Sequence, residues 1–319
     1  MRIDTRSMSG ERNRGAMTRT IWMACILGWM AAGNAAAETV DQTRPAAAKG
    51  VVSIDNLSGS VHVTGWSRKE VQVKGTLGEE VEKLIFEGEG ERTRIEVDIP
   101  DHLENKSMKS IESHLEVSVP AGSDVRIEGV NLEIAVAGVT GELDLQSVNG
   151  SVVANGKPEE MEISTVNGTI TLNAAAGKTH LDAVNGAIEV TGGSGELQAS
   201  CVNGRIEIRE GNFDEVTCST VSGDVVWSAG LNDRGSLGLE THSGSVLVEL
   251  PRGIDADFDV STFSGRIVNE LGPEAKPTSE YAPGYELHFA TGSGSVEIDI
   301  SSFSGDITIR SKGAGRRPE

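Results

Sequence analysis

The sequence predicts an all-β fold, a parallel β-solenoid (β-helix) with about 18 residues per coil that follows an N-terminal signal peptide. Three observations support this prediction. A short motif ending in Gly returns at intervals near 18 residues, and apolar residues alternate on both sides of it. The chain of 319 residues also contains 39 Gly and only 4% aromatic residues. This composition suits many short strands whose backbones approach closely.

The first 37 residues have the pattern of a removable export signal. Five arginines precede an apolar stretch from Ile21 to Ala32, and Ala35, Ala36 and Ala37 supply the small residues of a cleavage site. The apolar stretch is too short to span a bilayer. We therefore expect an exported protein of the periplasm or cell surface, with no membrane span after cleavage.

The charge of the chain limits its partners. The formal net charge is −20, and the first 37 residues carry more basic than acidic residues, so the remainder is still more acidic. Such a surface repels nucleic-acid phosphates and anionic lipid headgroups. We expect no nucleic-acid partner.

The repeat motif is Val-Asn-Gly in the middle of the chain and becomes His/Val/Phe-Ser-Gly toward its end. Apolar residues stand four before and three after its central residue, which is period-2 alternation around a tight turn. The central residues are predicted to form a structural ladder of Asn131, Asn149, Asn167, Asn185, Asn203, Ser222, Ser243, Ser264 and Ser304.

Two arrangements could bury the apolar residues of one repeat. An Asn-Gly turn could close a hairpin, with Ala183 opposite Ile188. Alternatively, Asn-Gly is the corner of a solenoid coil, and equivalent residues stack about 4.8 Å apart. The solenoid is favoured because it explains the regular return of the motif, lets the Asn amides bond to one another, and uses Gly for a positive φ at the corner.

The chain is expected to divide around this repeat. Three prolines, Pro273, Pro277 and Pro283, exclude regular sheet from one segment, and one short helix is predicted around Glu79 to Phe86. The predicted parts are a signal peptide (1–37), a flexible N-terminal tail (38–50), a solenoid domain (51–310) and a C-terminal tail (311–319). Within the domain we predict irregular opening coils (51–127), regular repeats of 18–21 residues (128–268), a loop insertion (269–286) and terminal strands (287–310).

A family resemblance rests on the repeats and on the opening segment Leu57-Ser58-Gly59-Ser60-Val61, followed by Gly65-Trp66 and Val71-Gln72-Val73. These residues resemble an uncharacterised family of bacterial exported β-strand-repeat proteins, a domain of unknown function whose members are often called adhesins. The resemblance covers residues 51–310. It implies a β-solenoid at the cell envelope and brings no catalytic residues with it.

The sequence offers no catalytic, cofactor-binding or metal site. The six His are scattered without ligand spacing. Cys201 and Cys218 are offset by two positions on adjacent coils, about 8 Å apart between Cα atoms and beyond bridging distance. Two buried thiols are expected, although the 19-residue step from Asn203 to Ser222 leaves a disulfide open as the alternative.

The expected function is a non-enzymatic, adhesin-like binding or scaffolding module of the cell envelope. Its partner would be an envelope protein or a surface polysaccharide. The alternative is a carbohydrate-active enzyme of β-helix type, a polysaccharide lyase or hydrolase, which needs converging carboxylates. Asp182, Glu189 and Glu207 are the nearest candidates, and their alternation away from the apolar columns indicates a solvated face instead.

Overall fold

The computed structural model describes residues 38–100, 108–279 and 283–313, all within the compact unit formed by residues 36–319. These residues form β-strands and one short 3-10 helix, η1 (Met108–Ile111). None of them belongs to a helix long and apolar enough to cross a membrane. The prediction of an all-β, solenoid-like fold is confirmed. The predicted signal peptide lies outside the described residues.

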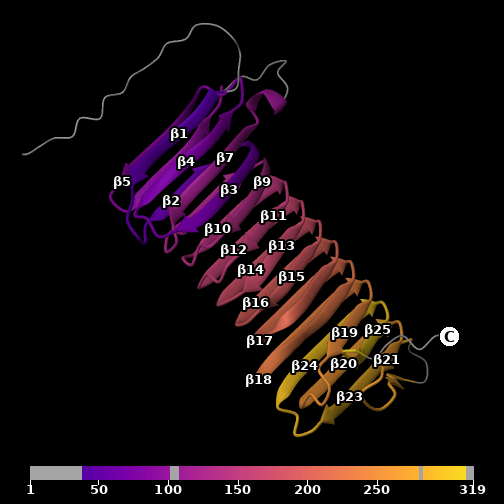
Figure 1. Ribbon diagram of the computed structural model, residues 1–319. Coiled ribbons are helices and arrows are strands. Elements are labelled where there is room, and N and C mark those ends of the chain that lie inside the picture. Colours follow the sequence, from indigo (N-terminus) through magenta and orange to yellow (C-terminus); the bar gives the residue numbers. More distant parts are fainter. Residues whose placement is uncertain (1–37, 101–107, 280–282, 314–319) are drawn as a thin grey trace, which may run out of the picture. The chain divides into compact units, whose positions relative to one another are not determined.

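Each regular coil consists of two strands that meet at the Asn-Gly corner (Figure 1). β10 (Leu143–Asn149) precedes the corner and β11 (Val152–Asn155) follows it. β10 pairs in parallel with β8 and β12, and β11 with β9 and β13. Leu145 lies opposite Ile163, its equivalent in the next repeat. Consecutive strands of one repeat do not pair with each other, so the hairpin arrangement is excluded.

The strands before the corner form a first layer and those after it a second layer. β17 and β18 run through both layers and join them into one continuous sheet. In spatial order the first layer is β5 (Lys83–Glu89), β6 (Arg92–Asp98), β2 (Val51–Asp55), β8 (Asp124–Gly129), β10, β12 (Glu160–Asn167), β14 (Lys178–Asn185), β16 (Glu196–Asn203), the second halves of β17 (Ile206–Ser222) and β18 (Val225–Ser243), β24 (Val296–Ser304), β20 (Ala256–Ser264), β23 (Tyr285–Thr291) and β22 (Lys276–Pro277). The second layer is β1 (Glu38–Pro45), β4 (Glu70–Leu77), β7 (Ser113–Pro120), β3 (Ser58–Trp66), β9 (Asn131–Ala137), β11, β13 (Ile170–Ala175), β15 (Ile188–Gly193), the first halves of β17 and β18, β19 (Val246–Leu250), β25 (Ile307–Ser311) and β21 (Ile267–Asn269).

The core lies between the two layers. Ile163 and Leu181 of the first layer and Ile170 and Ile188 of the second are fully buried in one apolar cluster. Successive side chains of a strand point to opposite sides, so every second residue enters the core and the residues between them face solvent. One repeat cannot bury its apolar side alone, and stacking in register completes the core.

The coils do not follow one another in chain order. The coil β2–β3 lies between the strands β6 and β7 on one side and the coil β8–β9 on the other. Likewise β24–β25, the last coil in the sequence, lies between β18–β19 and β20–β21. Antiparallel strands such as β4, β5 and β23 flank the parallel stack at its two ends. Such strands cover edges that would otherwise pair with other chains.

Three local predictions were wrong. The segment with three prolines is not free of sheet, because Lys276 and Pro277 form β22, which pairs antiparallel with β23. Residues 38–50 are not a flexible tail, because β1 pairs antiparallel with β4 along its whole length and buries Val40. The helix predicted around Glu79 to Phe86 is absent: the segment begins with a turn and continues into strand β5, which starts at Lys83 and pairs antiparallel with β6. An isolated helix of two turns is marginal in water, whereas β5 gains ladder hydrogen bonds to β6 along one side.

The reason given for the corner glycines was also wrong. Gly150, Gly168 and Gly186 lie outside the left-handed region of φ. A Cβ at Gly168 would lie 2.0 Å from the carbonyl oxygen of Gly150, and one at Gly186 would lie 1.8 Å from that of Gly168. Glycine is required there because the backbones of adjacent coils approach too closely for any side chain.

Candidate ligand groove along the Asn-Gly corner

The structure brings the five Asn residues of the predicted ladder into one row. Nδ2 of each Asn after Asn131 donates to Oδ1 of the preceding Asn, at 2.9 Å for Asn149 to Asn131, 2.7 Å for Asn167 to Asn149, 2.9 Å for Asn185 to Asn167 and 3.0 Å for Asn203 to Asn185. The four serines continue the row in register, in the spatial order Ser222, Ser243, Ser304, Ser264. Most of the row is exposed, so the ladder lines the outside of the corner.

A second row of hydrogen bonds lies behind the first. Thr165 Oγ1 donates to the Gly150 carbonyl at 3.3 Å, and Ser147 Oγ donates to the Leu132 carbonyl at 2.8 Å. Cys201 Sγ makes the equivalent contact with the Gly186 carbonyl at 3.2 Å. Each donor stands two residues before the ladder position and bonds to the corner of the preceding coil. In the sequence this column is mostly Ser and Thr, and the structure reveals its role.

Between these two rows, the residue directly before each Asn or Ser points outward. We call Val148, Val166, Val184, Val202 and Val221 the Val column. Their side chains are 38–52% exposed. Toward the C-terminal end the column continues as His242, Phe303 and Phe263, whose rings stack at centroid distances of 4.7 and 4.9 Å. A contiguous exposed apolar stripe on a soluble domain commonly marks a binding surface.

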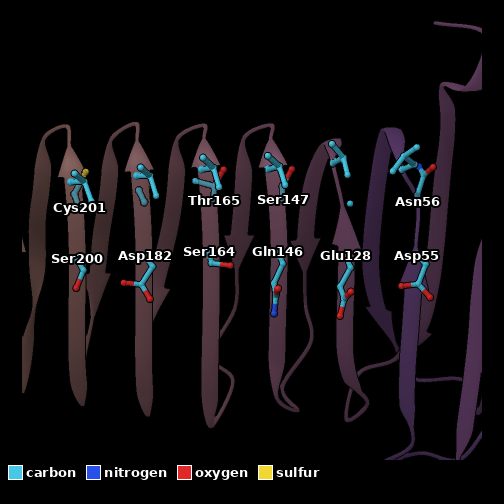
Figure 2. A pocket seen from close by; sticks show the side chains of 18 of the residues that line it. Asp55, Asn56, Glu128, Gln146, Ser147, Ser164, Thr165, Asp182, Ser200 and Cys201 are labelled. Carbon is cyan, nitrogen blue, oxygen red and sulfur yellow. The ribbon is translucent and has the colours of Figure 1, made fainter. Parts of the chain in front are cut away.

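The Val column forms one wall of a groove of about 820 Å³. Its other wall is a row of outward-facing side chains, one per strand, that lie three residues before the ladder position (Figure 2). Ser164, Ser200 and Ser219 in this row are small, which leaves space beside the valines. The labelled members of the row are Asp55, Glu128, Gln146, Ser164, Asp182 and Ser200. At one end Leu57, Val97 and Ile99 extend the apolar lining.

The groove carries carboxylates and no basic side chain among the described residues that line it. The acidic members are Asp55, Glu96, Glu128 and Asp182. Glu96 pairs with Arg94 at 2.6 Å, and Asp182 Oδ2 lies 2.7 Å from His180 Nε2, with both partners outside the lining. No ion pair joins Asp55 or Glu128 to a described residue. The groove therefore offers hydrogen-bond acceptors and negative charge next to an apolar wall.

The three candidate carboxylates do not converge. Asp182 lies on β14 in the first layer, whereas Glu189 of β15 and Glu207 of β17 lie opposite each other in the second layer. Glu207 pairs with Arg205 at 3.4 Å and with Arg209. A glycosidase needs two carboxyl groups on either side of one bond. The core separates Asp182 from the other two, and Glu207 is engaged by two arginines, so the three carboxylates do not form one catalytic group.

The cysteines are buried free thiols, as expected. In the register, Ala199 lies opposite Cys218 and Cys201 opposite Thr220, which is the predicted offset. Burial raises the pKa of Cys218 to about 12, and burial also raises the pKa of Cys201. Thiols of this kind are poor nucleophiles and poor metal ligands at neutral pH. Within the described ranges, no three His, Cys, Asp or Glu residues are grouped as a metal site.

The family of the chain is identified by one comparison with known proteins. The model of the family described as Toastrack DUF4097 matches residues 84–310. The comparison with curated proteins gave no match. Among solved structures, the chain is similar to a "putative adhesin" from Parabacteroides merdae (9% identity, 86% of this chain and 96% of that chain covered, TM-score 0.46). It is also similar to a "putative adhesin" from Parabacteroides distasonis (14% identity, 86% of this chain and 98% of that chain covered, TM-score 0.42). A "putative lipid binding protein" from the same organism is similar as well (12% identity, 85% of this chain and 96% of that chain covered, TM-score 0.37).

Proposed function

The chain belongs to the Toastrack DUF4097 family, and we propose that it is an exported, non-enzymatic binding module that holds an extended ligand in the groove along its Asn-Gly corner. The observation that carries the proposal is the Val column. Five valines on successive coils remain exposed, although each costs free energy in water and could be replaced by a polar residue without disturbing the core.

The repetition of the groove favours an extended ligand over a compact one. Strands of one layer lie about 4.8 Å apart, so the seven coils from Leu57 to Val221 cover about 29 Å. A chain lying along the groove would meet the same pair of surfaces, apolar on one side and polar on the other, at every coil. No described arrangement of carboxylates favours a polysaccharide lyase or hydrolase.

Binding is tested with four immobilised polymers: poly-lysine, poly-glutamate, dextran and alginate. The purified protein should bind at least one of them saturably. The variant Val166→Thr/Val184→Thr keeps side-chain shape and strand propensity but removes apolar surface, and it should weaken binding about tenfold, which is 1.4 kcal/mol. Val268→Thr is the matched control, because Val268 is a similarly exposed valine of the second layer. Absence of saturable binding, or equal effects of both variants, would contradict the proposal.

Export is tested separately. N-terminal sequencing of protein recovered outside the cytoplasm should begin at or near Glu38. Recovery of the intact chain only in the cytoplasm would contradict an exported role.

A further inference from the structure

We infer that the ligand of the groove is a cationic, amphipathic polypeptide segment. This inference rests on the proposed function, and it adds the chemical class of the ligand. Its first support is charge complementarity, since the lining contains four carboxylates and none of its described residues is Lys, Arg or His. A cationic side chain gains attraction from such a surface, and an anionic one is repelled.

The negative charge is concentrated at one end of the groove. Glu96, Asp55 and Glu128 lie opposite one another on the neighbouring strands β6, β2 and β8. Like charges directly opposite in a sheet are destabilising. Arg94 neutralises Glu96, but no described cation is paired with Asp55 or Glu128. A Lys or Arg side chain of a ligand would relieve this repulsion.

A buried polar side chain lies at the same end of the groove. Asn56 is 2% exposed and lines the groove beside Asp55 (Figure 2). Its Nδ2 donates to the Ser113 carbonyl at 3.1 Å, which fixes the orientation of the amide. Its Oδ1 has no hydrogen-bond partner among the described residues. Asn56 stands two residues before the ladder position, as Ser147 and Thr165 do, so its side chain forms part of the buried floor of the groove, and the proposed contacts with the ligand come from the carboxylates and the Val column.

The apolar wall of the groove indicates that the ligand also carries apolar side chains. A purely cationic chain would leave the Val column in water, whereas apolar side chains on one edge of the segment would cover it. About nine residues of extended chain span the 29 Å from Leu57 to Val221, at roughly 3.3 Å per residue. The fitting segment therefore has Lys or Arg on one side, apolar residues on the other, and a length near ten residues.

The test uses fluorescein-labelled peptides of 12 residues in anisotropy titrations with the purified protein. A peptide of alternating Lys and Leu should bind, an alternating Glu-Leu peptide should not, and an alternating Lys-Ser peptide should bind at least tenfold more weakly. The variant Asp55→Asn/Glu128→Gln should weaken binding of the Lys-Leu peptide about tenfold and reduce its salt dependence. Asp257→Asn/Glu297→Gln is the control, because these residues are also opposite each other in the first layer but lie away from the groove.

Two outcomes would overturn the inference. The first is equal binding of the Lys-Leu peptide to both charge variants. The second is that no peptide binds, whereas dextran or alginate binds in a way that depends on Val166 and Val184. This result would support the proposed function but would identify the ligand as a polysaccharide instead of a polypeptide. Failure of every polymer and peptide would overturn the proposed function as well.

Discussion

Asn167 Nδ2 donates to Asn149 Oδ1 at 2.7 Å, and Asn167 Oδ1 accepts from Asn185 Nδ2 at 2.9 Å. The middle of the ladder thus has a partner on each side, whereas Asn131 accepts a single ladder bond from Asn149. All amides donate in the same direction along the row. The corners of the five Asn coils are thereby bonded to one another through side chains as well as through the backbone.

Replacement of Asn167 by Leu should destabilise the protein by about 1–3 kcal/mol, because two hydrogen bonds worth roughly 0.5–1.5 kcal/mol each are lost. Asn131→Leu should cost about half as much. Urea unfolding of both variants checks the difference. Equal costs would show that each Asn acts only within its own turn.

Gly168→Ala should destabilise by about 3 kcal/mol, the upper end of the usual cost of overpacking. The new Cβ would overlap the Gly150 carbonyl of the preceding coil. Gly238→Ala is the matched control, because the nearest atom to its Cβ would lie at 3.8 Å. Thermal unfolding of the two variants measures the contrast, and similar melting temperatures would refute the close-approach explanation.

Cys201 and Cys218 should resist thiol reagents at pH 8 in the folded protein. Both are buried, and burial raises the pKa of each, so little thiolate forms. Both should react at once in urea, as Ellman's reagent would report. A non-reduced protein two mass units lighter than the reduced form would instead reveal a disulfide.

Asp255 should make stability depend on acid pH. Its carboxylate accepts from Ser293 Oγ at 2.7 Å and from the Gly294 and Ser295 backbone N–H groups, and these bonds, the Ser293 hydroxyl first, lower its pKa. Because the pKa of Asp255 is lower in the folded than in the unfolded state, its carboxylate stabilises the protein at pH values above the unfolded-state pKa, near 3.9. This stabilisation disappears as the pH falls through the folded-state pKa. Asp255→Asn should therefore lose stability at pH 7 and converge with the parent protein in strong acid. A constant difference across this pH range in urea melts would exclude the carboxylate as the cause.

The sequence was sufficient to predict the stacking of Leu145 on Ile163, because period-2 alternation and a constant repeat length admit few registers. It could not predict that Phe303 lies between His242 and Phe263. All coils present the same alternation to their neighbours, so the pattern does not determine which coil stacks on which. The order depends on the antiparallel strands and the insertion around β22 and β23, whose residues carry no repeat.

The groove was missed for a different reason. In the sequence Val148 and its equivalents are only the first residue of the repeat motif, and nothing in the motif marks them as a surface, because apolar residues are usually buried. The alternation itself contained the correct signal: Ser147 is buried, so Val148 must face outward. The buried acceptor of Asn56 had no such signal, since its burial depends on β7, which reaches it from another part of the chain.

Methyl NMR of the protein labelled at valine tests the central claim most directly. On addition of the alternating Lys-Leu peptide, the methyl signals of Val148, Val166, Val184 and Val202 should shift together and saturate at one common affinity. The signal of Val268, exposed on the second layer, should stay in place. Shifts centred on Val268, or saturable binding that leaves the Val column unchanged, would show that the groove along the Asn-Gly corner is not the binding surface.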